Sequence, residues 1–242
     1  MSRHHFVWSD LATFDVAQAC RDYQSLFGWI YTGSADYQFA MLADNIIAGI
    51  FNMPDRLVKI NMPSFWMSYI HVADTDACVA KARQHPHVVV EIEPHDFNDN
   101  ARIALLRDPS GAGFTVYAGP VLGHDEETAG FVTERYYHGE NLRLIAPFYE
   151  DVFGWRFVLR GQQPWQVFEI SDDENNHVGF VEEVPEEIRG QFSYWMPCFK
   201  VISITDAVAA LTRAGGEQFA DLGNERVLAS DAQGAHFMLS TR

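Results

Sequence analysis

The hydrophobic positions at the start of the chain change from strand-like to helix-like spacing. Residues Phe6 to Thr13 suit a strand, and Asp15 is placed to cap a helix. Apolar residues then recur at helical spacing, at Val16, Ala19, Cys20, Tyr23 and Phe27. Gly28 is expected to end this helix, because glycine readily adopts the left-handed backbone of a helix C-terminus. The pattern predicts a strand followed by a helix.

Three more strands are predicted after this helix, over 29–32, 37–42 and 46–53, which completes a βαβββ module. Residues 65–118 follow the same plan, with Asp74 or Thr75 capping the helix, Pro86 stopping it, and His95 and Asp96 in a loop. Similar modules are predicted over 131–184 and from 194 onward. Because an interior proline costs about 3 kcal/mol, the third helix is expected to begin late, with Pro147 in its first turn.

Three short motifs occur twice, in the same order and at nearly the same spacing. The segment LFGW at 26–29 recurs as VFGW at 152–155, FWM at 65–67 recurs as YWM at 194–196, and DPSGAGF at 108–114 recurs as DAQGAHF at 231–237. The second half therefore duplicates the first. We predict an α+β fold with one domain over 1–119 (modules about 1–60 and 63–119), a linker over 120–128, and a second domain over 129–242 (modules about 129–186 and 191–242).

The charge of the chain limits its partners. The formal net charge is -16 and the sequence pI is near 4.9, so the surface repels phosphate backbones and anionic lipids. Neither nucleic acid nor a membrane is expected as a partner. The sequence has no apolar run long enough for a membrane span and no signal-peptide pattern at its start, so a cytoplasmic protein is expected.

Familiar reactive motifs are missing from the sequence. The three cysteines, Cys20, Cys78 and Cys198, lie far apart without a CxxC pair, which argues against a disulfide framework and a structural zinc site. The chain also lacks GxSxG, HExxH, P-loop and GxGxxG motifs. No nucleophile paired with a base is indicated.

The ordered motifs resemble those of the vicinal oxygen chelate superfamily, which includes glyoxalase I, bleomycin-resistance proteins and extradiol dioxygenases. The similarity is carried by the helix ending in Phe27-Gly28-Trp29, by the turn at 108–111, and by their copies. In detail the chain looks most like two-domain proteins described as glyoxalase-like, hydroxylase or 27 kDa antigen. The resemblance implies that two modules pair edge to edge into a trough. In active members the trough holds a divalent metal through one residue from the first and one from the last strand of each module.

The positions that correspond to these metal ligands hold few suitable donors. In the first half they fall on Trp8, about Gly49, Met67 (or Trp66, if the register slips by one) and Thr115. In the second half they fall on Glu134, about Gly179, Met196 or Trp195, and Met238. Only Glu134 could coordinate a hard divalent metal, and one carboxylate does not make a site. No cofactor is expected; the minor alternative is an off-pattern metal site built from Glu134, His177 and His236.

Aromatic and thioether side chains are expected to line the trough instead, either around a ligand or as a filled core. His71 shares a face with Met67 and Tyr69 by alternation, and Arg102 is expected either to hold an anionic group or to pair with surface acids. The residues predicted to contact a ligand are Trp8, Trp66, Met67, Tyr69, His71, Arg102, Thr115, Tyr117, Tyr136, Trp195 and Met238.

Three functional hypotheses follow from these observations. The first is a protein that binds a small molecule without a metal. The second is a glyoxalase-like lyase or isomerase, or a hydroxylase or dioxygenase, acting on a small carbonyl or aromatic metabolite, with Glu134 as the general base and Tyr136 nearby. The third is a structural or interaction module that kept the fold and lost the chemistry. A monomer or a homodimer is expected.

Overall fold

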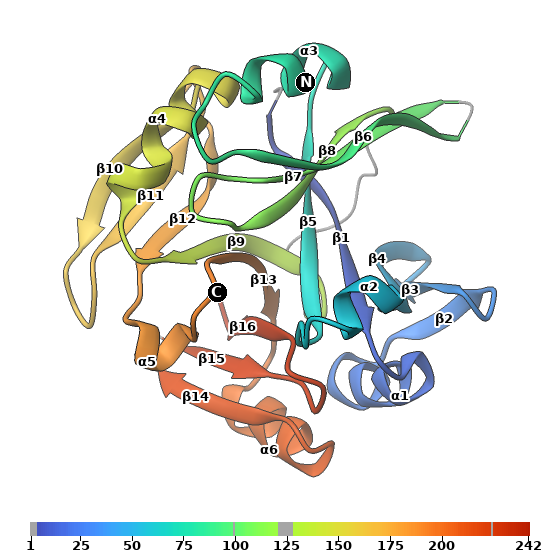
Figure 1. The fold of residues 1–242 in the computed structure, drawn as a ribbon. Coiled ribbons are helices and arrows are strands. Elements are labelled where there is room, and N and C mark those ends of the chain that lie inside the picture. The colour runs from blue at the N-terminus through green and yellow to red at the C-terminus, as the bar shows by residue number, and fades with distance from the viewer. Residues whose placement is uncertain (1–3, 99, 121–127, 224) are drawn as a thin grey trace. The chain divides into compact units, whose positions relative to one another are not determined.

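The structure is a computed structural model that describes residues 4–98, 100–120, 128–223 and 225–242 (Figure 1). The first half of the chain forms β1 (Phe6–Thr13), α1 (Val16–Phe27), β2 (Ile30–Gly33), β3 (Tyr37–Leu42), β4 (Asn45–Asn52), α2 (Asp55–Val58), β5 (Phe65–His71), α3 (Thr75–Ala82), β6 (Val89–Asn98), β7 (Ala101–Arg107) and β8 (Gly113–Ala118). The second half forms β9 (Val132–Gly139), α4 (Leu142–Phe153), β10 (Arg156–Gly161), β11 (Val167–Ser171), β12 (His177–Glu183), α5 (Glu186–Arg189), β13 (Tyr194–Lys200), α6 (Ile204–Arg213), β14 (Glu217–Asp221), β15 (Arg226–Ser230) and β16 (His236–Ser240).

The strands form two eight-stranded mixed sheets with the same topology. Their orders are β2-β3-β4-β1-β5-β8-β7-β6 and β10-β11-β12-β9-β13-β16-β15-β14. In each module the first strand pairs in parallel with the last, as in β1 with β4 and β9 with β12. The remaining pairs within a module are antiparallel. This arrangement confirms the predicted α+β fold of four βαβββ modules.

Helix α1 begins and ends at the residues that the sequence indicated, and α4 has equivalent caps. The Asp15 side chain accepts a hydrogen bond from the Gln18 amide (2.8 Å) at the start of α1, and Gly28 closes α1 at φ 74°. In the second half Asn141 caps α4 through the Arg143 amide (2.9 Å), and Gly154 closes α4 at φ 71°. A residue with a side chain at either glycine would be strained, because positive φ disfavours a Cβ.

The predicted late start of the third helix is wrong. Helix α4 begins at Leu142, so Pro147 lies inside it. The start is held by the Asn141 cap and by the Glu183 carboxylate, which accepts a hydrogen bond from the Leu142 amide (2.8 Å). Pro147 is exposed while Phe148 and Tyr149 beside it are buried. Burial of these large side chains offsets the hydrogen bond that the proline cannot make.

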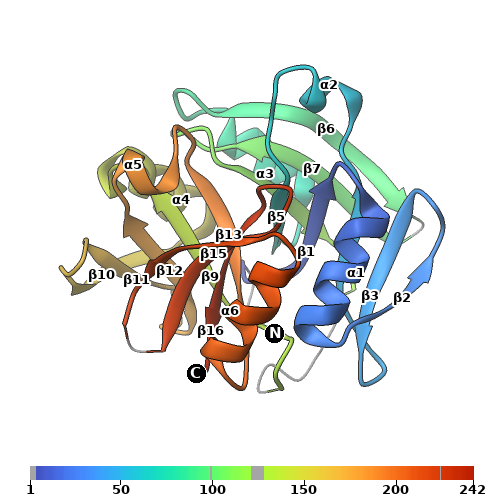
Figure 2. The ribbon, with the colours of Figure 1, turned by 90° about the horizontal axis from the view of Figure 1, so that it is seen from below.

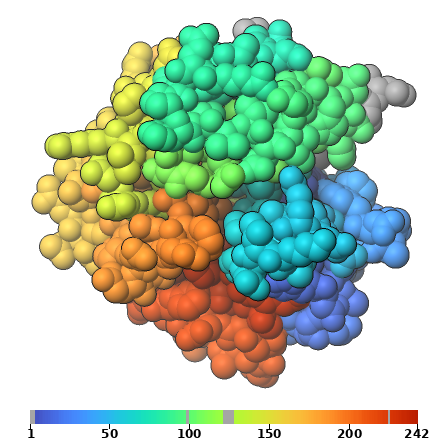
Figure 3. Space-filling model, in the orientation of Figure 1, coloured from blue at the N-terminus to red at the C-terminus, as the bar shows by residue number. Residues whose placement is uncertain are grey.

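Three local features differ from the sequence prediction. The short helices α2 and α5 were not predicted; α2 buries none of its side chains and lies at the surface (Figure 3). His95 and Asp96, expected in a loop, belong to strand β6, where they pair with Ile103 and Arg102 of β7. Register shifts along this long hairpin obscure the alternation that would have revealed the strand.

Residue contacts divide the chain into two compact units. As far as their residues are described, unit 1 contains Met1–Val7, Ser68–Leu122 and Glu134–Trp195, and unit 2 contains Trp8–Met67, Gly123–Thr133 and Met196–Arg242. Each unit therefore combines one module of the first half with one of the second. Helices α3 and α4 touch in unit 1, and α1 and α6 touch in unit 2 (Figure 2). The predicted domain limits at 119 and 129 stay a prediction, since linker residues 121–127 lie outside the described part.

The core of each unit lies between its two modules. In unit 2 it joins Tyr23, Trp29 and Trp66 to Phe199 and Phe237. In unit 1 it joins residues of β5, β7 and β8 to those of α4, β12 and β13. Strand residues alternate between this core and the opposite side, which we call the helix-free face. No helix in the described part of the chain has the length and apolar character needed to cross a membrane.

Candidate functional site

The helix-free face of the first module, in unit 2, carries a buried carboxylate among aromatic rings. Asp10 in β1 is only 4% exposed. Its Oδ1 atom accepts hydrogen bonds from the Trp8 indole nitrogen (2.6 Å) and from the Tyr37 hydroxyl (2.5 Å). Burial and the neighbouring Asp10 carboxylate raise the pKa of Tyr37, so its hydroxyl stays protonated and donates. We call Trp8, Asp10, Tyr37 and Phe39 the Asp10 cluster; the sequence had indicated only Trp8.

The rings of this cluster are inclined to one another and partly open to solvent. The ring centroids of Trp8 and Phe39 are 6.4 Å apart with planes at 62°, and those of Tyr37 and Phe39 are 4.9 Å apart at 61°. Trp8 and Tyr37 are half-buried and Phe39 is 38% exposed. Aromatic faces beside a fixed polar group are typical of small-molecule sites.

Gly49 makes this cluster possible. It pairs with Asp10 on one side and with Phe39 on the other, in the middle of the three strands. A Cβ at this position would overlap the Tyr37 hydroxyl and the Asp10 carboxylate. The glycine therefore leaves the space in which the Tyr37–Asp10 hydrogen bond forms.

Four predicted ligand-contacting residues lie together on the helix-free face of unit 1. Tyr69 of β5 pairs with Thr115 of β8, and His71 pairs with Tyr117. The His71 and Tyr117 ring centroids are 6.4 Å apart. The His71 Nδ1 atom is buried and has no hydrogen-bond partner among the described residues. Met67 lies on the same side of β5 by alternation.

Glu134 belongs to an ion-pair network on β9, β11 and β12 of unit 1. The His177 Nε2 atom lies 2.8 Å from Glu134 and its Nδ1 atom 3.0 Å from Glu169, which Arg160 also contacts at 2.6 Å. Hydrogen bonding to Glu134 raises the pKa of His177, against the opposing effect of burial, and Glu169 adds to the rise. The sequence named Glu134 and His177; the structure adds Glu169. We call Glu134, Glu169 and His177 the His177 cluster.

His236 lies in unit 2, where its ring packs against Phe219 with centroids 4.9 Å apart. Across the described ranges, no three His, Cys, Asp or Glu side chains are grouped so that they could hold a metal. The resemblance to the vicinal oxygen chelate superfamily predicts ligand positions at Trp8, Gly49, Met67 and Thr115, and this mapping stays a prediction. None of these four side chains suits a hard divalent metal. In the second half Tyr136 pairs with Phe180, just as Asp10 pairs with Gly49 in the first half. The residue equivalent to Gly49 is therefore Phe180, one position after the Gly179 that the sequence suggested.

Trp66 and Trp195 lie away from the helix-free face, and their assignment as ligand contacts stays a prediction that their burial does not support. They are 3% and 2% exposed and lie in the two cores. The Trp66 nitrogen donates to the Tyr23 hydroxyl (3.1 Å), and the Trp195 nitrogen to the Tyr149 hydroxyl (2.8 Å). A one-residue slip in register moves a side chain to the other side of a strand. Met67 was the alternative to Trp66 in the sequence analysis. Its side chain lies on the other side of β5 from that of Trp66.

The hydroxyls of the two buried tyrosines donate hydrogen bonds to aspartates at equivalent positions of the two halves. Tyr23 donates to Asp231 (3.0 Å) in unit 2, and Tyr149 donates to Asp108 (3.1 Å) in unit 1. The second oxygen of each aspartate accepts backbone amides of its own turn: from Ser110 and Ala112 at Asp108, and from Gln233 and Ala235 at Asp231. Each tyrosine comes from the opposite half of the chain. The repeated DPSG and DAQG motifs therefore hold the cores together.

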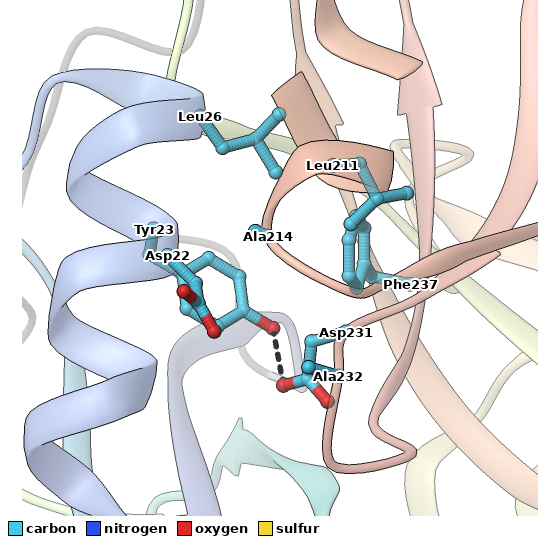
Figure 4. Close-up of a pocket in the computed structure, with 8 residues that line it drawn as sticks. All are labelled: Asp22, Tyr23, Leu26, Leu211, Ala214, Asp231, Ala232 and Phe237. Atoms are coloured by element: carbon cyan, nitrogen blue, oxygen red, sulfur yellow. Dashed lines mark hydrogen bonds between the residues drawn. The ribbon is translucent and has the colours of Figure 1, made fainter. Parts of the chain in front are cut away.

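A small pocket lies beside Tyr23 and Asp231 (Figure 4). It has a volume of about 10 Å³ and is lined by Asp22, Tyr23, Leu26, Leu211, Ala214, Asp231, Ala232 and Phe237. This volume suits about one water molecule and no organic ligand. Burial raises the pKa of Asp231, and the nearby Asp22 adds to the rise.

A fully buried histidine–glutamate pair was not anticipated from the sequence. His138 and Glu182 are both 0% exposed and lie 2.9 Å apart on paired strands of unit 1. The Trp165 nitrogen also donates to Glu182 (3.1 Å). Alternation along β9 places His138 on the same side as Glu134 and Tyr136, which was the available signal. The hydrogen bond between His138 and Glu182 gives each of these buried polar groups a partner, which offsets part of the cost of burying them.

Three more predicted residues have different environments. Arg102 contacts Asp76 (2.6 Å) on α3 and Asp96 (2.8 Å) on β6, the pairing with surface acids that the sequence analysis gave as one alternative; its contact with a ligand stays a prediction. Met238 is fully buried opposite Cys198 in unit 2. Tyr136 is 4% exposed and stacks on Phe180, with centroids 5.2 Å apart. The sequence analysis left open whether such side chains surround a ligand or fill a core. The burial of Met238 and Tyr136 agrees with a filled core at these two positions.

Comparison with known proteins places the chain among glyoxalase-like proteins. No protein-family model matches it. The "Putative glyoxylase CFP32" of Mycobacterium tuberculosis is 31% identical over 248 residues, which cover 95% of this chain and 92% of that protein, and its Mycobacterium bovis counterpart matches equally. The anthracycline biosynthesis protein DauV of a Streptomyces species is 28% identical over 136 residues, covering 50% of this chain and 49% of that protein.

Solved structures share the fold at low sequence identity. The Mn(II)-bound glyoxalase from Novosphingobium aromaticivorans has a TM-score of 0.65 and 12% identity, covering 100% of this chain and 84% of its own. The 2,3-dioxygenase LapB from Pseudomonas sp. KL28 has a TM-score of 0.66 and 14% identity, covering 99% and 92%. Together with the four modules, these matches show that the chain belongs to the glyoxalase family of the vicinal oxygen chelate fold.

Proposed function

We propose that the protein binds a small aromatic molecule at the Asp10 cluster, without a metal such as the Mn(II) bound by the glyoxalase from Novosphingobium aromaticivorans. The observation that carries the proposal is the set of inclined, partly exposed rings around buried Asp10. Trp8 and Gly49 stand at two positions where the resemblance implies metal ligands, and neither side chain offers a donor for a hard divalent metal. Aromatic rings bury large areas at low conformational cost, and the carboxylate supplies a fixed polar reference.

The names of several relatives agree with an aromatic ligand. One structural neighbour is a homoprotocatechuate 2,3-dioxygenase and another a 2,2',3-trihydroxybiphenyl 1,2-dioxygenase. Two sequence relatives are described as anthracycline biosynthesis proteins. These names belong to those proteins; for this chain they support only the choice of aromatic probes.

Trp8 provides a direct reporter of binding. It is half-buried, whereas the other five tryptophans are each 8% exposed or less. We expect 2-naphthol and 1,4-dihydroxyanthraquinone to quench the fluorescence of EDTA-treated protein saturably, and added Mn(II) to leave the affinity unchanged. The reason is that a molecule stacked on Trp8 contacts the one indole that is partly exposed to solvent.

Isothermal calorimetry separates loss of signal from loss of binding. Trp8→Leu should weaken binding about fivefold, since one aromatic contact contributes roughly 1 kcal/mol beyond its area. Phe97→Leu, at a residue 61% exposed in unit 1, is the matched control and should change nothing. Absence of binding by both probes, or binding that requires Mn(II), would refute the proposal.

Metal-free proton transfer by Glu134 is a second candidate, favoured by its 2.8 Å contact with His177. A carboxylate paired with an imidazole can remove and return a proton at a carbon next to a carbonyl. If this activity exists, the protein should catalyse exchange of the hydroxyacetone α-protons in D₂O, followed by proton NMR. Glu134→Gln should then lower the rate at least about 100-fold, while the exposed Glu150→Gln should not. No exchange by the unaltered protein would eliminate this candidate.

A further inference from the structure

We propose that the segment 54–63, which contains α2, is a flap that closes over the ligand of the Asp10 cluster. We call it the α2 segment. The inference rests on the proposed function and adds how access to that site is controlled. It follows from three observations: the α2 segment is attached by hydrogen bonds only at its ends, its apolar side chains are exposed, and its hinge lies beside the Asp10 cluster.

Hydrogen bonds tie the two ends of the α2 segment to the end of strand β1. Just before the segment, the Met53 amide donates to the Thr13 carbonyl (2.8 Å). Just after it, the Ser64 hydroxyl donates to the Ala12 carbonyl (2.8 Å). Among the described residues, every hydrogen bond that the α2 segment itself makes stays inside the segment. A loop with neighbouring ends and internal bonding can move as one body.

The apolar side chains of the α2 segment are left in water. Val58 is 42% and Ile60 67% exposed, and no side chain from 54 to 63 is buried. The segment stands at the surface in Figure 3, where it is drawn in cyan. Removal of such side chains from water is favourable. A closed position in which they cover a ligand is therefore stabilised by burial that the open position lacks.

The equivalent segment of the third module is fixed by an arginine that the α2 segment lacks. Pro185 precedes α5 as Pro54 precedes α2, with similar backbone angles of φ -56°, ψ 147° and φ -59°, ψ 137°. Four residues after Pro185, Arg189 is only 7% exposed and donates to three backbone carbonyls of its own segment. The corresponding residue after Pro54 is the exposed Val58. Of the two segments, only the one beside the Asp10 cluster is free of this anchor.

The hinge of the α2 segment lies next to the Asp10 cluster in unit 2. Thr13 follows Asp10 by three residues on β1, which is about 10 Å along a strand. On β4, Phe51 pairs with Tyr37 of the cluster and stacks on its ring, with centroids 6.2 Å apart, and the α2 segment begins three residues later.

A ligand gives the α2 segment a reason to close. A molecule stacked on the half-buried Trp8 keeps one apolar face in water. Closure of the α2 segment over that face buries the ligand together with the exposed side chains of the segment. Because these contacts exist only in the closed position, ligand binding shifts the segment toward it.

Amide hydrogen exchange of the full chain, followed by mass spectrometry, tests the closure. Without a ligand, the amides of 54–63 should exchange faster than those of 186–190 around α5. Saturating 2-naphthol should slow exchange in 54–63 about tenfold and leave 186–190 unchanged. Equal slowing in both segments would show a general stabilisation of the protein and overturn the inference, as would unchanged exchange in 54–63 while 2-naphthol binds.

The substitution Ile60→Ser removes apolar surface from the flap without altering the Asp10 cluster. Because Ile60 is 67% exposed in the free protein, the fold should be unaffected. We expect 2-naphthol to dissociate about tenfold faster in stopped-flow measurements of Trp8 fluorescence, and its affinity in calorimetry to fall by a similar factor. Ile202→Ser, at a residue 90% exposed in the same unit but outside the α2 segment, is the matched control and should change neither.

The outcomes separate the two proposals. If 2-naphthol quenches Trp8 but Ile60→Ser binds it as the unaltered protein does, the closing flap is wrong and the proposed function stands. If Ile60→Ser and Ile202→Ser weaken binding equally, the loss does not come from the α2 segment and the inference also fails. If neither 2-naphthol nor 1,4-dihydroxyanthraquinone binds, the proposed function fails and the flap fails with it.

Discussion

Residues 1–119 expressed alone are expected not to form a stable tertiary structure, and the same is expected of residues 129–242. Each half supplies only part of two cores. In unit 2, Tyr23 and Trp29 of the first half pack with Phe199 and Phe237 of the second. An isolated half would expose these large aromatic surfaces, and burial of apolar area is the main source of folding free energy.

The hydrogen bonds inside each unit reinforce this dependence. Tyr23 needs Asp231, and Tyr149 needs Asp108, each from the opposite half. Without its partner, a buried tyrosine hydroxyl or aspartate is left unsatisfied at a cost of about 1–3 kcal/mol. Near-ultraviolet circular dichroism and amide hydrogen exchange would detect the loss of fixed packing. An equimolar mixture of the two halves is the control, and it should recover the spectrum of the intact chain. Cooperative unfolding of either half alone would contradict the prediction.

Asp108→Ala is expected to destabilise the protein by about 3–5 kcal/mol at pH 5. Asp108 is 0% exposed and accepts hydrogen bonds from the Ser110 amide (2.8 Å), the Ala112 amide (3.0 Å) and the Tyr149 hydroxyl (3.1 Å). Alanine removes the acceptor of all three donors, and leaves the Ala112 amide and the Tyr149 hydroxyl buried without it. Urea unfolding measures the difference.

The effect of this substitution should depend on pH. Burial raises the pKa of Asp108 from 3.8 to about 6, despite hydrogen bonds that favour the charged form. Because the folded pKa lies above the unfolded one, the contribution of Asp108 is fully present below about pH 4 and is lost as pH rises through about 6. A shift of this size amounts to about 3 kcal/mol. The destabilisation by Asp108→Ala should therefore shrink by up to about that amount between pH 4 and pH 7.

The exposed aspartate Asp36 provides the matched control for the pH dependence. Asp36→Ala should change the free energy of unfolding by less than about 0.5 kcal/mol at every pH, as surface substitutions usually do. A destabilisation by Asp108→Ala that stays constant from pH 4 to pH 7 would show that this carboxyl titrates normally in the folded protein.

The candidate site was only partly accessible from the sequence. Alternation placed Tyr69 and His71 on one face of a strand, and their pairing with Thr115 and Tyr117 agrees with it. Asp10 was overlooked, although it follows Trp8 by two residues on the same strand, because its hydrogen-bond partner Tyr37 lies on β3, on the far side of the intervening strand β4. His138 was overlooked for a similar reason, since Glu182 is distant in sequence.

The sequence by itself determined the features that depend on neighbouring residues. The caps at Asp15 and Gly28, the βαβββ order and the duplication follow from local backbone preferences and periodicity. Only the tertiary structure decided which modules share a core, because Tyr23 and Asp231 meet through packing that no local pattern encodes. It also decided where Pro147 lies and which way Trp66 and Arg102 point. In each case burial or charge pairing with distant residues outweighed the local preference.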